Sequence, residues 1–363
     1  MTSKRAVALA IAGAALAVLV FAAVVGEGDD PDRSPGDSRG KEAGRAPGTG
    51  AANTKRGAAR GTATGRGAGT SAPGAAGEKA AGSPRAGTAL PEEPHWNVYL
   101  VGAGGGPPRR LTDTGSEAPE NPDWSPVGTR IVIAGMDCED CDAGLRVVSA
   151  ADSSSRRLRT PVANVADPSW SPNGRRLAVT RVGGVIYSID SATGAARRLT
   201  SDGEASEGPA WSPNARKIAY ARQVSAANWD IYAMNADGSG KRPITSGPRQ
   251  ELAPAWSPNG RKIAFQRQER SGVWAVYTAN ADGSHARRIT YGRSSGEQPS
   301  WSPNGRKIAF VRVTVDGSRI VVVRLGGGRN QHEFVTPLSL QAAYPDWSPD
   351  GNTIAFTAKR HHE

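Results

Sequence analysis

The chain has few of the side chains that usually carry catalysis or hold a metal. Its 363 residues include two cysteines and five histidines. A structural metal site needs more soft ligands than the single Cys-x-x-Cys that the cysteines form. His95, His285 and His332 lie far apart without metal-ligand spacing, and His361 and His362 end the sequence. We therefore predict no metal site, no cofactor and no catalytic group.

The two cysteines form the segment Cys138-Glu-Asp-Cys141. Thioredoxin-like redox chemistry would need a βαβ context, which the surrounding sequence lacks. Outside the cytoplasm a disulfide is the natural state of such a pair. Closing so short a loop would stabilise the protein by roughly 2 kcal/mol. We predict a disulfide between Cys138 and Cys141 that staples a loop.

Residues 27–93 have almost no aliphatic or aromatic side chains and consist mainly of Gly, Ala, Pro, Thr, Ser and Arg. Such a segment buries too little apolar surface to offset its ordering entropy, so we predict a disordered linker. Residues 6–25 are apolar or small and follow Lys4 and Arg5. They could span about 30 Å of bilayer. Residues 1–26 are predicted as a membrane anchor, or alternatively a cleaved signal peptide, that places the rest outside the cytoplasm.

What the chain has in abundance is one repeated phrase, Pro-x-Trp-Ser-Pro. Its tryptophans are Trp124, Trp170, Trp211, Trp256, Trp301 and Trp347. They lie 46, 41, 45, 45 and 46 residues apart, the period of a four-stranded propeller blade. After each motif come a turn and a short apolar strand. The six tryptophans are expected to pack between neighbouring blades.

The fourth copy shows why the repeat predicts a blade. Ser257-Pro-Asn-Gly260 has the residue preferences of a type I turn. A strand-like run follows it, and Val273-Trp-Ala-Val-Tyr-Thr-Ala279 is a second strand by alternation and propensity. Asn280-Ala-Asp-Gly-Ser284 is typical of a hairpin turn, and Arg287-Arg-Ile-Thr290 supplies the outer strand.

The two ends of the array each supply half a blade. Residues 97–101 and 108–112 precede the first motif as a second half without a first half. Thr353-Ile-Ala-Phe-Thr357 follows the last motif as a first half without a second half. Joining them completes six blades and leaves no open sheet edge at the seam. The predicted fold is all-β, a six-bladed β-propeller over residues 94–360 that closes by a blade shared between its N- and C-terminal ends.

The motif Pro-x-Trp-Ser-Pro-Asp/Asn-Gly resembles the WD-like repeat of the TolB-like β-propeller family. The resemblance covers about residues 95–358. TolB itself carries an α/β domain ahead of its propeller and works in a Gram-negative periplasm with a peptidoglycan-associated lipoprotein. The region ahead of the repeats here is low-complexity, so that role does not carry over. Two copies also depart from the motif, because Val127 replaces Asn or Asp and Ala215 replaces Gly.

Propeller enzymes with similar repeats set two further expectations. Oligogalacturonate-lyase-like proteins use a histidine-rich metal site in the channel, and this chain has too few histidines for one. Peptidases of the dipeptidyl-peptidase and tricorn type attach a hydrolase domain, and only a few residues follow the last blade. Both comparisons favour a protein that is not an enzyme.

The net charge of +11 predicts two different faces. Basic pairs lie at the turns inside hairpins, and the opposite loops collect carboxylates. The basic pairs are Arg175-Arg176, Arg197-Arg198, Arg216-Lys217, Lys241-Arg242, Arg261-Lys262, Arg287-Arg288 and Arg306-Lys307. We expect them to be solvated surface or to contact anionic lipid or wall polymer. Nucleic acid is not an expected partner outside the cytoplasm.

The carboxylates suggest a binding site at the mouth of the channel. Glu120, Glu207 and Glu297 each stand two residues before a motif proline, and Glu251 and Asp167 lie nearby. Such a group attracts cations or basic peptide segments, although scattered exposed carboxylates are the simpler interpretation. We expect a monomeric, non-catalytic binding or scaffold module for an envelope protein, peptide or cationic ligand. The alternative is an envelope hydrolase or lyase that acts on polysaccharide or peptide in the channel.

Overall fold

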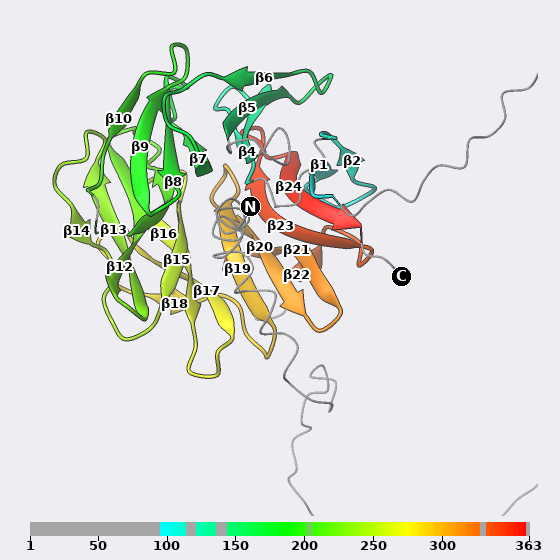
Figure 1. Cartoon of the computed structure of the whole chain (residues 1–363). Helices are drawn as coiled ribbons and strands as arrows, with labels where there is room; N and C mark the ends of the chain where they lie inside the picture. Colours follow the sequence, from blue (N-terminus) through cyan, green and yellow to red (C-terminus); the bar gives the residue numbers. More distant parts are fainter. Residues whose placement is uncertain are drawn as a thin grey trace, which may run out of the picture. The chain divides into compact units, whose positions relative to one another are not determined.

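The computed structural model describes residues 95–113, 121–135, 144–201, 203, 205–326 and 332–360. They form six four-stranded antiparallel sheets arranged as the blades of a ring (Figure 1). The all-β, six-bladed propeller predicted from the repeats is therefore confirmed. The predicted anchor, the predicted linker and the Cys138–Cys141 pair lie outside the described residues. Within the described ranges, no helix has the length and apolar character needed to span a membrane.

Five blades are built from strands that are consecutive in the chain. Blades 1 and 2 consist of β3 (Asp123–Trp124), β4 (Arg130–Gly135), β5 (Gly144–Ser149), β6 (Ser155–Leu158), β7 (Val165–Trp170), β8 (Arg176–Arg181), β9 (Val185–Asp190) and β10 (Ala196–Arg198). Blade 3 consists of β11 (Ser206–Trp211), β12 (Lys217–Ser225), β13 (Asn228–Asn235) and β14 (Arg242–Pro243). Blades 4 and 5 consist of β15 (Glu251–Trp256), β16 (Lys262–Gln268), β17 (Trp274–Asn280), β18 (Arg287–Arg288), β19 (Ser295–Trp301), β20 (Lys307–Thr314), β21 (Gly317–Arg324) and β22 (His332–Phe334).

The sixth blade joins the two ends of the propeller, as the sequence predicts. Its strands β23 (Leu340–Trp347) and β24 (Thr353–Arg360) come from the end of the chain, and β1 (Asn97–Gly102) and β2 (Arg109–Arg110) precede blade 1. The order across the sheet is β2-β1-β24-β23. Strand β1 is antiparallel to β24 along its whole length, from Asn97 opposite Ala358 to Gly102 opposite Thr353. The seam is thus closed by a full ladder of backbone pairs.

Each motif turn is held by its own residues. In blade 4 the Gly260 N–H donates to the Ser257 carbonyl over 2.8 Å, which closes the turn. The Asn259 Oδ1 accepts from the Ser257 hydroxyl at 2.8 Å and from the Arg261 N–H at 3.0 Å. The first turn lacks this amide because Val127 takes its place, yet it closes by the same 2.8 Å backbone bond to Ser125. The side-chain bonds are therefore not essential for the turn.

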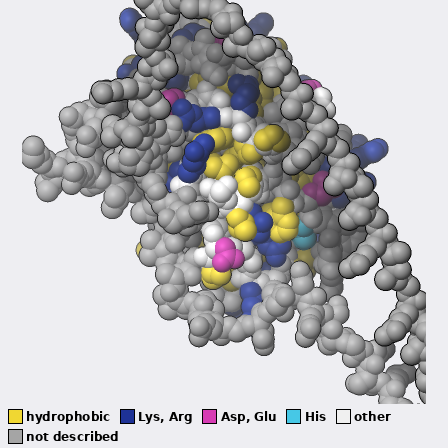
Figure 2. All heavy atoms as spheres, turned by 90° about the vertical axis from the view of Figure 1, so that its right-hand side faces the viewer, with side chains coloured by type: hydrophobic (Ala, Val, Ile, Leu, Met, Phe, Trp, Pro, Cys, Tyr) yellow, Lys and Arg dark blue, Asp and Glu magenta, His cyan; other side chains and the backbone are white. Residues whose placement is uncertain are grey.

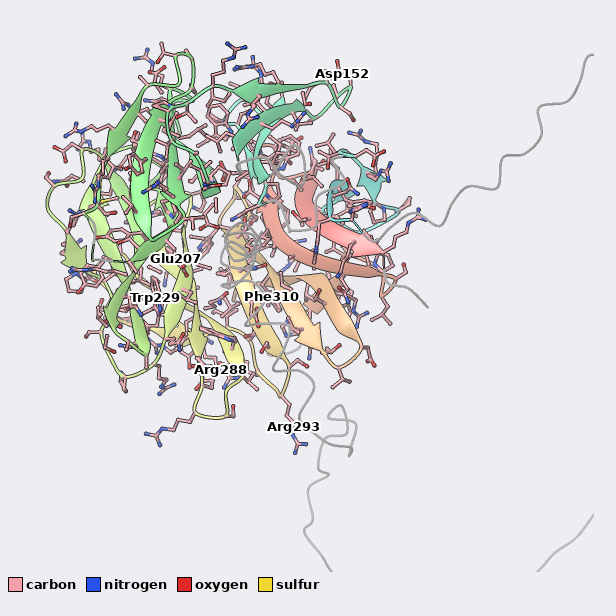
Figure 3. The ribbon with its side chains drawn as sticks, in the orientation of Figure 1. Asp152, Glu207, Trp229, Arg288, Arg293 and Phe310 are labelled. Carbon is pink, nitrogen blue, oxygen red and sulfur yellow. The ribbon has the colours of Figure 1, made fainter. Side chains whose placement is uncertain are left out.

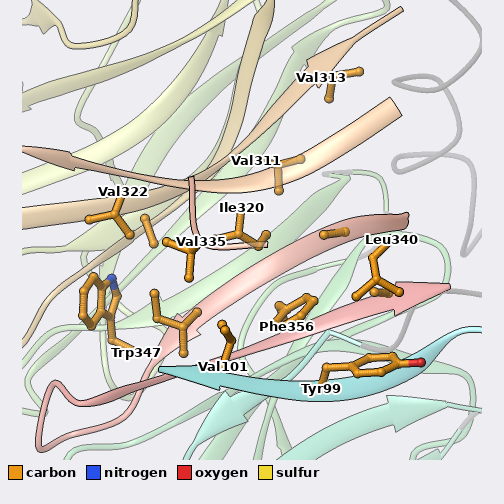
Figure 4. Close-up of a cluster of buried hydrophobic side chains, with 14 residues drawn as sticks. Tyr99, Val101, Val311, Val313, Ile320, Val322, Val335, Leu340, Trp347 and Phe356 are labelled. Carbon is orange, nitrogen blue, oxygen red and sulfur yellow. The ribbon is translucent and has the colours of Figure 1, made fainter. Parts of the chain in front are cut away.

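Six hydrophobic clusters fill the six boundaries between blades. The cluster between blades 5 and 6 contains Val311 and Val322 from one blade and Trp347, Phe356 and Tyr99 from the other (Figure 4). At every boundary the motif tryptophan of the later blade joins the cluster. Trp124, Trp211, Trp301 and Trp347 are buried, and Trp170 and Trp256 are partly buried.

The innermost strands of blades 2 to 6 share an irregularity that shapes the centre of the ring. Strand pairing slips next to the motif proline, because proline has no N–H to donate to the ladder. The residue before each of these prolines has a positive φ: Asp167, Gly208, Ala253, Gln298 and Tyr344. This conformation is unusual for residues other than glycine. It reverses the side-chain alternation locally and turns these residues toward the channel.

Candidate functional site in the central channel

A cavity of about 210 Å³ lies where the six innermost strands meet. Each blade contributes the residues around its motif proline: Asn121–Asp123, Asp167–Ser169, Glu207–Ala210, Leu252–Ala255, Gln298–Ser300 and Tyr344–Asp346, with Gln266. Among these lining residues Asp123, Asp167, Glu207 and Asp346 are acidic, and none is Lys, Arg or His. The lining therefore favours a ligand that carries positive charge.

Side chains from one blade hold the bulged backbone of the next. The Gln266 Oε1 accepts from the Gln298 N–H over 2.8 Å, and the Gln298 Oε1 accepts from the Tyr344 N–H over 2.8 Å. In blade 3 the Gly208 N–H donates to Thr180 Oγ1 at 3.1 Å and to Asp167 Oδ2 at 3.3 Å. These bonds satisfy backbone groups that the bulge removes from the ladder. The channel lining is thus fixed before any ligand binds.

At the end of the channel near the motif turns, two aspartates lie on either side of the boundary between blades 6 and 1. Asp346 accepts from the Trp124 N–H at 2.8 Å and the Ser300 hydroxyl at 3.1 Å, and Asp123 accepts from the Trp170 N–H at 2.7 Å. Burial raises the pKa of Asp346 to about 6. Burial and the nearby Asp346 charge raise the pKa of Asp123 well above its usual value. The pair releases its protons at higher pH than ordinary aspartates.

At the other end, near the blade-to-blade connections, a second acidic group surrounds Tyr344. Burial, and then the charge of Asp167, raises the pKa of Glu207 to about 7. Burial raises the pKa of Glu297 to about 8, although a hydrogen bond to Ser295 opposes the shift. Burial and the charges of Asp167, Glu207 and Glu297 raise the pKa of Tyr344 above that of an ordinary tyrosine.

The structure separates the carboxylates that the sequence groups together. Asp167 and Glu207 line the cavity, whereas Glu297 is 2% exposed and lies behind the lining. Glu251, also 2% exposed, accepts from the Arg267 Nε at 2.6 Å and forms an ion pair with its guanidinium. Glu251 therefore faces the boundary between blades and not the channel. Glu120 lies outside the described residues.

Sequence reasoning missed several lining residues, among them Asp123, Asp346 and Tyr344. A signal for the aspartates was present, because each occupies the variable position of the Pro-x-Trp motif. The equivalent residues in the other blades are Ser169, Ala210, Ala255 and Ser300, and all of them line the cavity. Tyr344 had no such signal, because its orientation depends on the bulge. Across the described ranges, no three His, Cys, Asp or Glu side chains are close enough together to hold a metal ion.

The hairpin-turn face carries both signs of charge. The first member of each predicted basic pair is exposed. Asp152, Asp190, Asp237 and Asp282 lie in the outer turns of the same face, and hydrogen bonds from neighbouring Ser, Thr or backbone groups lower their pKa values. Figure 3 shows Asp152 at the tip of the β5–β6 hairpin. On the side seen in Figure 2, Lys and Arg side chains form separate groups among apolar ones.

Comparisons with known proteins agree with this architecture. Residues 205–363 match the family model of the TolB beta propeller domain. Over these residues the propeller is TolB-like. No curated protein sequence matches the chain significantly.

Among solved structures, a protein from Agrobacterium tumefaciens assigned as a TolB is 23% identical, with a TM-score of 0.63 over 74% of this chain and 100% of that one. TolB from Acinetobacter baumannii is 15% identical, with a TM-score of 0.53 over 74% of this chain and 65% of that one. A chain of a nidogen/laminin complex is 10% identical, with a TM-score of 0.52 over 63% of this chain and 89% of that one. At these identities the likeness shows a shared fold and nothing more.

Proposed function

We propose that this chain is a non-catalytic binding or scaffold propeller of the cell envelope, which takes a protein, peptide or cationic ligand at its channel. The observation that carries the proposal is the cavity lining. Four of its side chains are carboxylic acids, and the lining contains no basic side chain to neutralise them. A Lys or Arg side chain of a partner would supply the missing charge and would draw protons off the acids with raised pKa values.

The cellular setting of the proposal comes from the sequence. The apolar residues 6–25 behind Lys4 and Arg5 favour a propeller that is tethered outside the cytoplasm. In this setting the acidic channel would take an envelope protein or peptide. The exposed basic residues of the hairpin-turn face would contact anionic lipid or wall polymer.

Binding of a fluorescent oligolysine peptide to the full chain, followed by anisotropy, tests the channel proposal. The affinity should fall at least about tenfold in Asp167→Asn/Glu207→Gln, because the charges that attract the peptide are lost. Glu333→Gln, which changes an exposed glutamate on the outer strand β22, is the matched control. If the double variant binds the peptide as tightly as the control does, the channel is not the binding site.

One observation also supports the alternative of an envelope hydrolase or lyase. Glu207 faces a cavity, and its pKa of about 7 suits a group that both gives and accepts protons near neutral pH. Incubation with envelope polysaccharides and peptides, with product analysis, tests this candidate. Turnover that disappears in Glu207→Gln while oligolysine binding persists would favour the enzyme over the scaffold.

A further inference from the structure

The backbone of Tyr344 has a left-handed conformation, which is unusual for a bulky residue. Its φ is 51°, and Tyr344 stands directly before the motif proline of blade 6. The equivalent residue of blade 3 is Gly208, for which a positive φ carries no steric cost. For a tyrosine the same conformation is a genuine outlier, and such outliers gather at functional sites. Because the fold accepts glycine at this position, the strain at Tyr344 points to a role for its side chain.

The Tyr344 side chain lies among the carboxylates of the cavity. It shares the lining with Asp167 from blade 2 and Glu207 from blade 3. Burial and the charges of Asp167, Glu207 and Glu297 raise the pKa of the Tyr344 phenol, so these carboxylates lie near it. The Gln298 Oε1 accepts from the Tyr344 N–H over 2.8 Å and holds the backbone that carries the ring. The tyrosine is therefore held beside two carboxylates of the lining.

Other aromatic rings of the propeller are covered by arginine side chains. The Arg222 Cζ lies 4.9 Å from the ring centre of Tyr232, and the Arg267 Cζ lies 4.5 Å from that of Tyr277. Among the residues that the structure describes, no arginine or lysine lies over the Tyr344 ring, and no group hydrogen-bonds to its hydroxyl. Tyr344 thus has acidic neighbours but lacks the cation that similar rings have.

We propose that Tyr344 makes the channel selective for an arginine side chain of the partner over a lysine side chain. A guanidinium is planar, so its edge can donate to carboxylates while its face stacks on an aromatic ring. Asp167 and Glu207 would accept its N–H groups, and the Tyr344 ring would lie against its face. An ammonium can bind the same carboxylates, but it has no flat face to stack. This inference rests on the proposed function, because it names the cationic group that the channel takes.

Anisotropy of fluorescent oligoarginine and oligolysine peptides of equal length, bound to the full chain, tests the selectivity. The unaltered chain should bind oligoarginine at least about fivefold more tightly, because stacking on the tyrosine ring favours a guanidinium. In Tyr344→Gly the ratio of the two affinities should fall at least about threefold, mainly through weaker binding of oligoarginine. Tyr344→Phe retains an aromatic face and should keep the ratio.

Tyr344→Gly copies the residue that blade 3 uses, so the variant should fold, and its Tm checks this. Tyr344→Leu, which has an apolar side chain without an aromatic face, gives a second test and should lower the ratio as well. Ala253→Gly is the matched control, because Ala253 lines the same cavity and has the same φ of 51°. This control relieves backbone strain without removing a ring, so it should keep the selectivity.

The experiment separates this inference from the proposed function. Equal affinity of the unaltered chain for the two peptides would overturn the selectivity and leave the channel as a general cation site. An unchanged ratio in both Tyr344→Gly and Tyr344→Leu would likewise overturn the role of the ring. Binding of neither peptide to the unaltered chain would overturn both the proposed function and the inference.

Discussion

Ala215 is the one non-glycine residue at the fourth position of the motif turns. Its φ is 58°, close to the 68° of Gly174 and Gly260. The left-handed conformation predicted for this turn is therefore present, and it costs an alanine on the order of 1 kcal/mol. The fold tolerates this cost because the turn closes like the others, with a 2.9 Å bond from the Ala215 N–H to the Ser212 carbonyl.

Ala215→Gly should therefore stabilise the propeller by about 1 kcal/mol, or roughly 2 °C in Tm. The converse change, Gly260→Ala, should destabilise it by at least as much, because the new Cβ would also lie 3.4 Å from the Pro213 side chain of the preceding blade. Denaturant unfolding of both variants checks the pair. Equal stability of the two would show that strain at this position is negligible.

The buried Glu297 makes stability depend on pH. Its pKa is about 8 in the folded protein, above the ordinary value of 4.5. Between these two values the folded state holds the proton more tightly than the unfolded state, so stability falls as pH rises through this window. Glu297→Gln should remove the loss, which is on the order of a few kcal/mol above pH 8.

The measurement is the Tm of the unaltered chain and of Glu297→Gln at pH 4.5 and pH 8.5. The Tm of Glu297→Gln should exceed the Tm of the unaltered chain only at pH 8.5. The same substitution at the exposed Glu333 is the control. A difference between Glu297→Gln and the unaltered chain that is the same at both pH values would contradict the assigned cause.

At the scale of the element, the sequence predicts features that depend on a few neighbouring residues. It does not predict side-chain directions next to the bulges. Ser257-Pro-Asn-Gly260 and its equivalents set turn geometry within a few residues, so blade number and the shared seam can be read directly. The positions of the Glu207 and Glu251 side chains cannot be predicted in this way. Glu207 and Glu297 both stand two residues before their prolines, yet only Glu207 lines the cavity, and Glu251, three residues before its proline, pairs with Arg267 instead.

The amide side chains of Gln266 and Gln298 accept hydrogen bonds from the bulged backbone of the next blade, which gives a prediction at the scale of the element. Gln298→Ala removes the acceptor of the Tyr344 N–H and should cost about 1 kcal/mol. Gln223→Ala, whose exposed amide makes only a 3.4 Å contact, is the control and should be nearly neutral. Denaturant unfolding compares the two. If Gln298→Ala is no worse than the control, water replaces the lost acceptor and these amides do not hold the bulge.

At the scale of the whole molecule, stability depends on closing the ring through β1 and β2. Deleting residues 95–113 should lower the Tm by on the order of 10 °C or more, because β24 loses the strand that pairs with its outer edge. Attaching the same residues after Arg360 should restore it, since the start of β1 lies beside the end of β24. An unchanged Tm after deletion, or no rescue by the transplant, would contradict closure as the source of stability.

The two faces of the ring give the last prediction, because their charges are arranged differently. The hairpin-turn face has exposed basic residues beside aspartates that already serve as turn caps, whereas the channel has carboxylates without basic neighbours in its lining. An anionic surface should therefore contact the hairpin-turn face and leave the acidic channel free for a cationic partner. Binding of the full chain to anionic vesicles should weaken with salt, since exposed charges are screened over about 8 Å at physiological ionic strength.

Binding to anionic vesicles, measured by co-sedimentation, should weaken further in Arg261→Glu/Lys262→Glu/Arg306→Glu/Lys307→Glu. It should be unaffected in Asp167→Asn/Glu207→Gln. The two variants separate the faces because one alters residues of the motif turns and of the strand starts beside them, and the other only channel residues. Equal retention of binding in both would mean that the turn aspartates neutralise the basic residues locally. Within the part of the chain that the structure describes, the channel would then be the strongly charged surface that selects a partner.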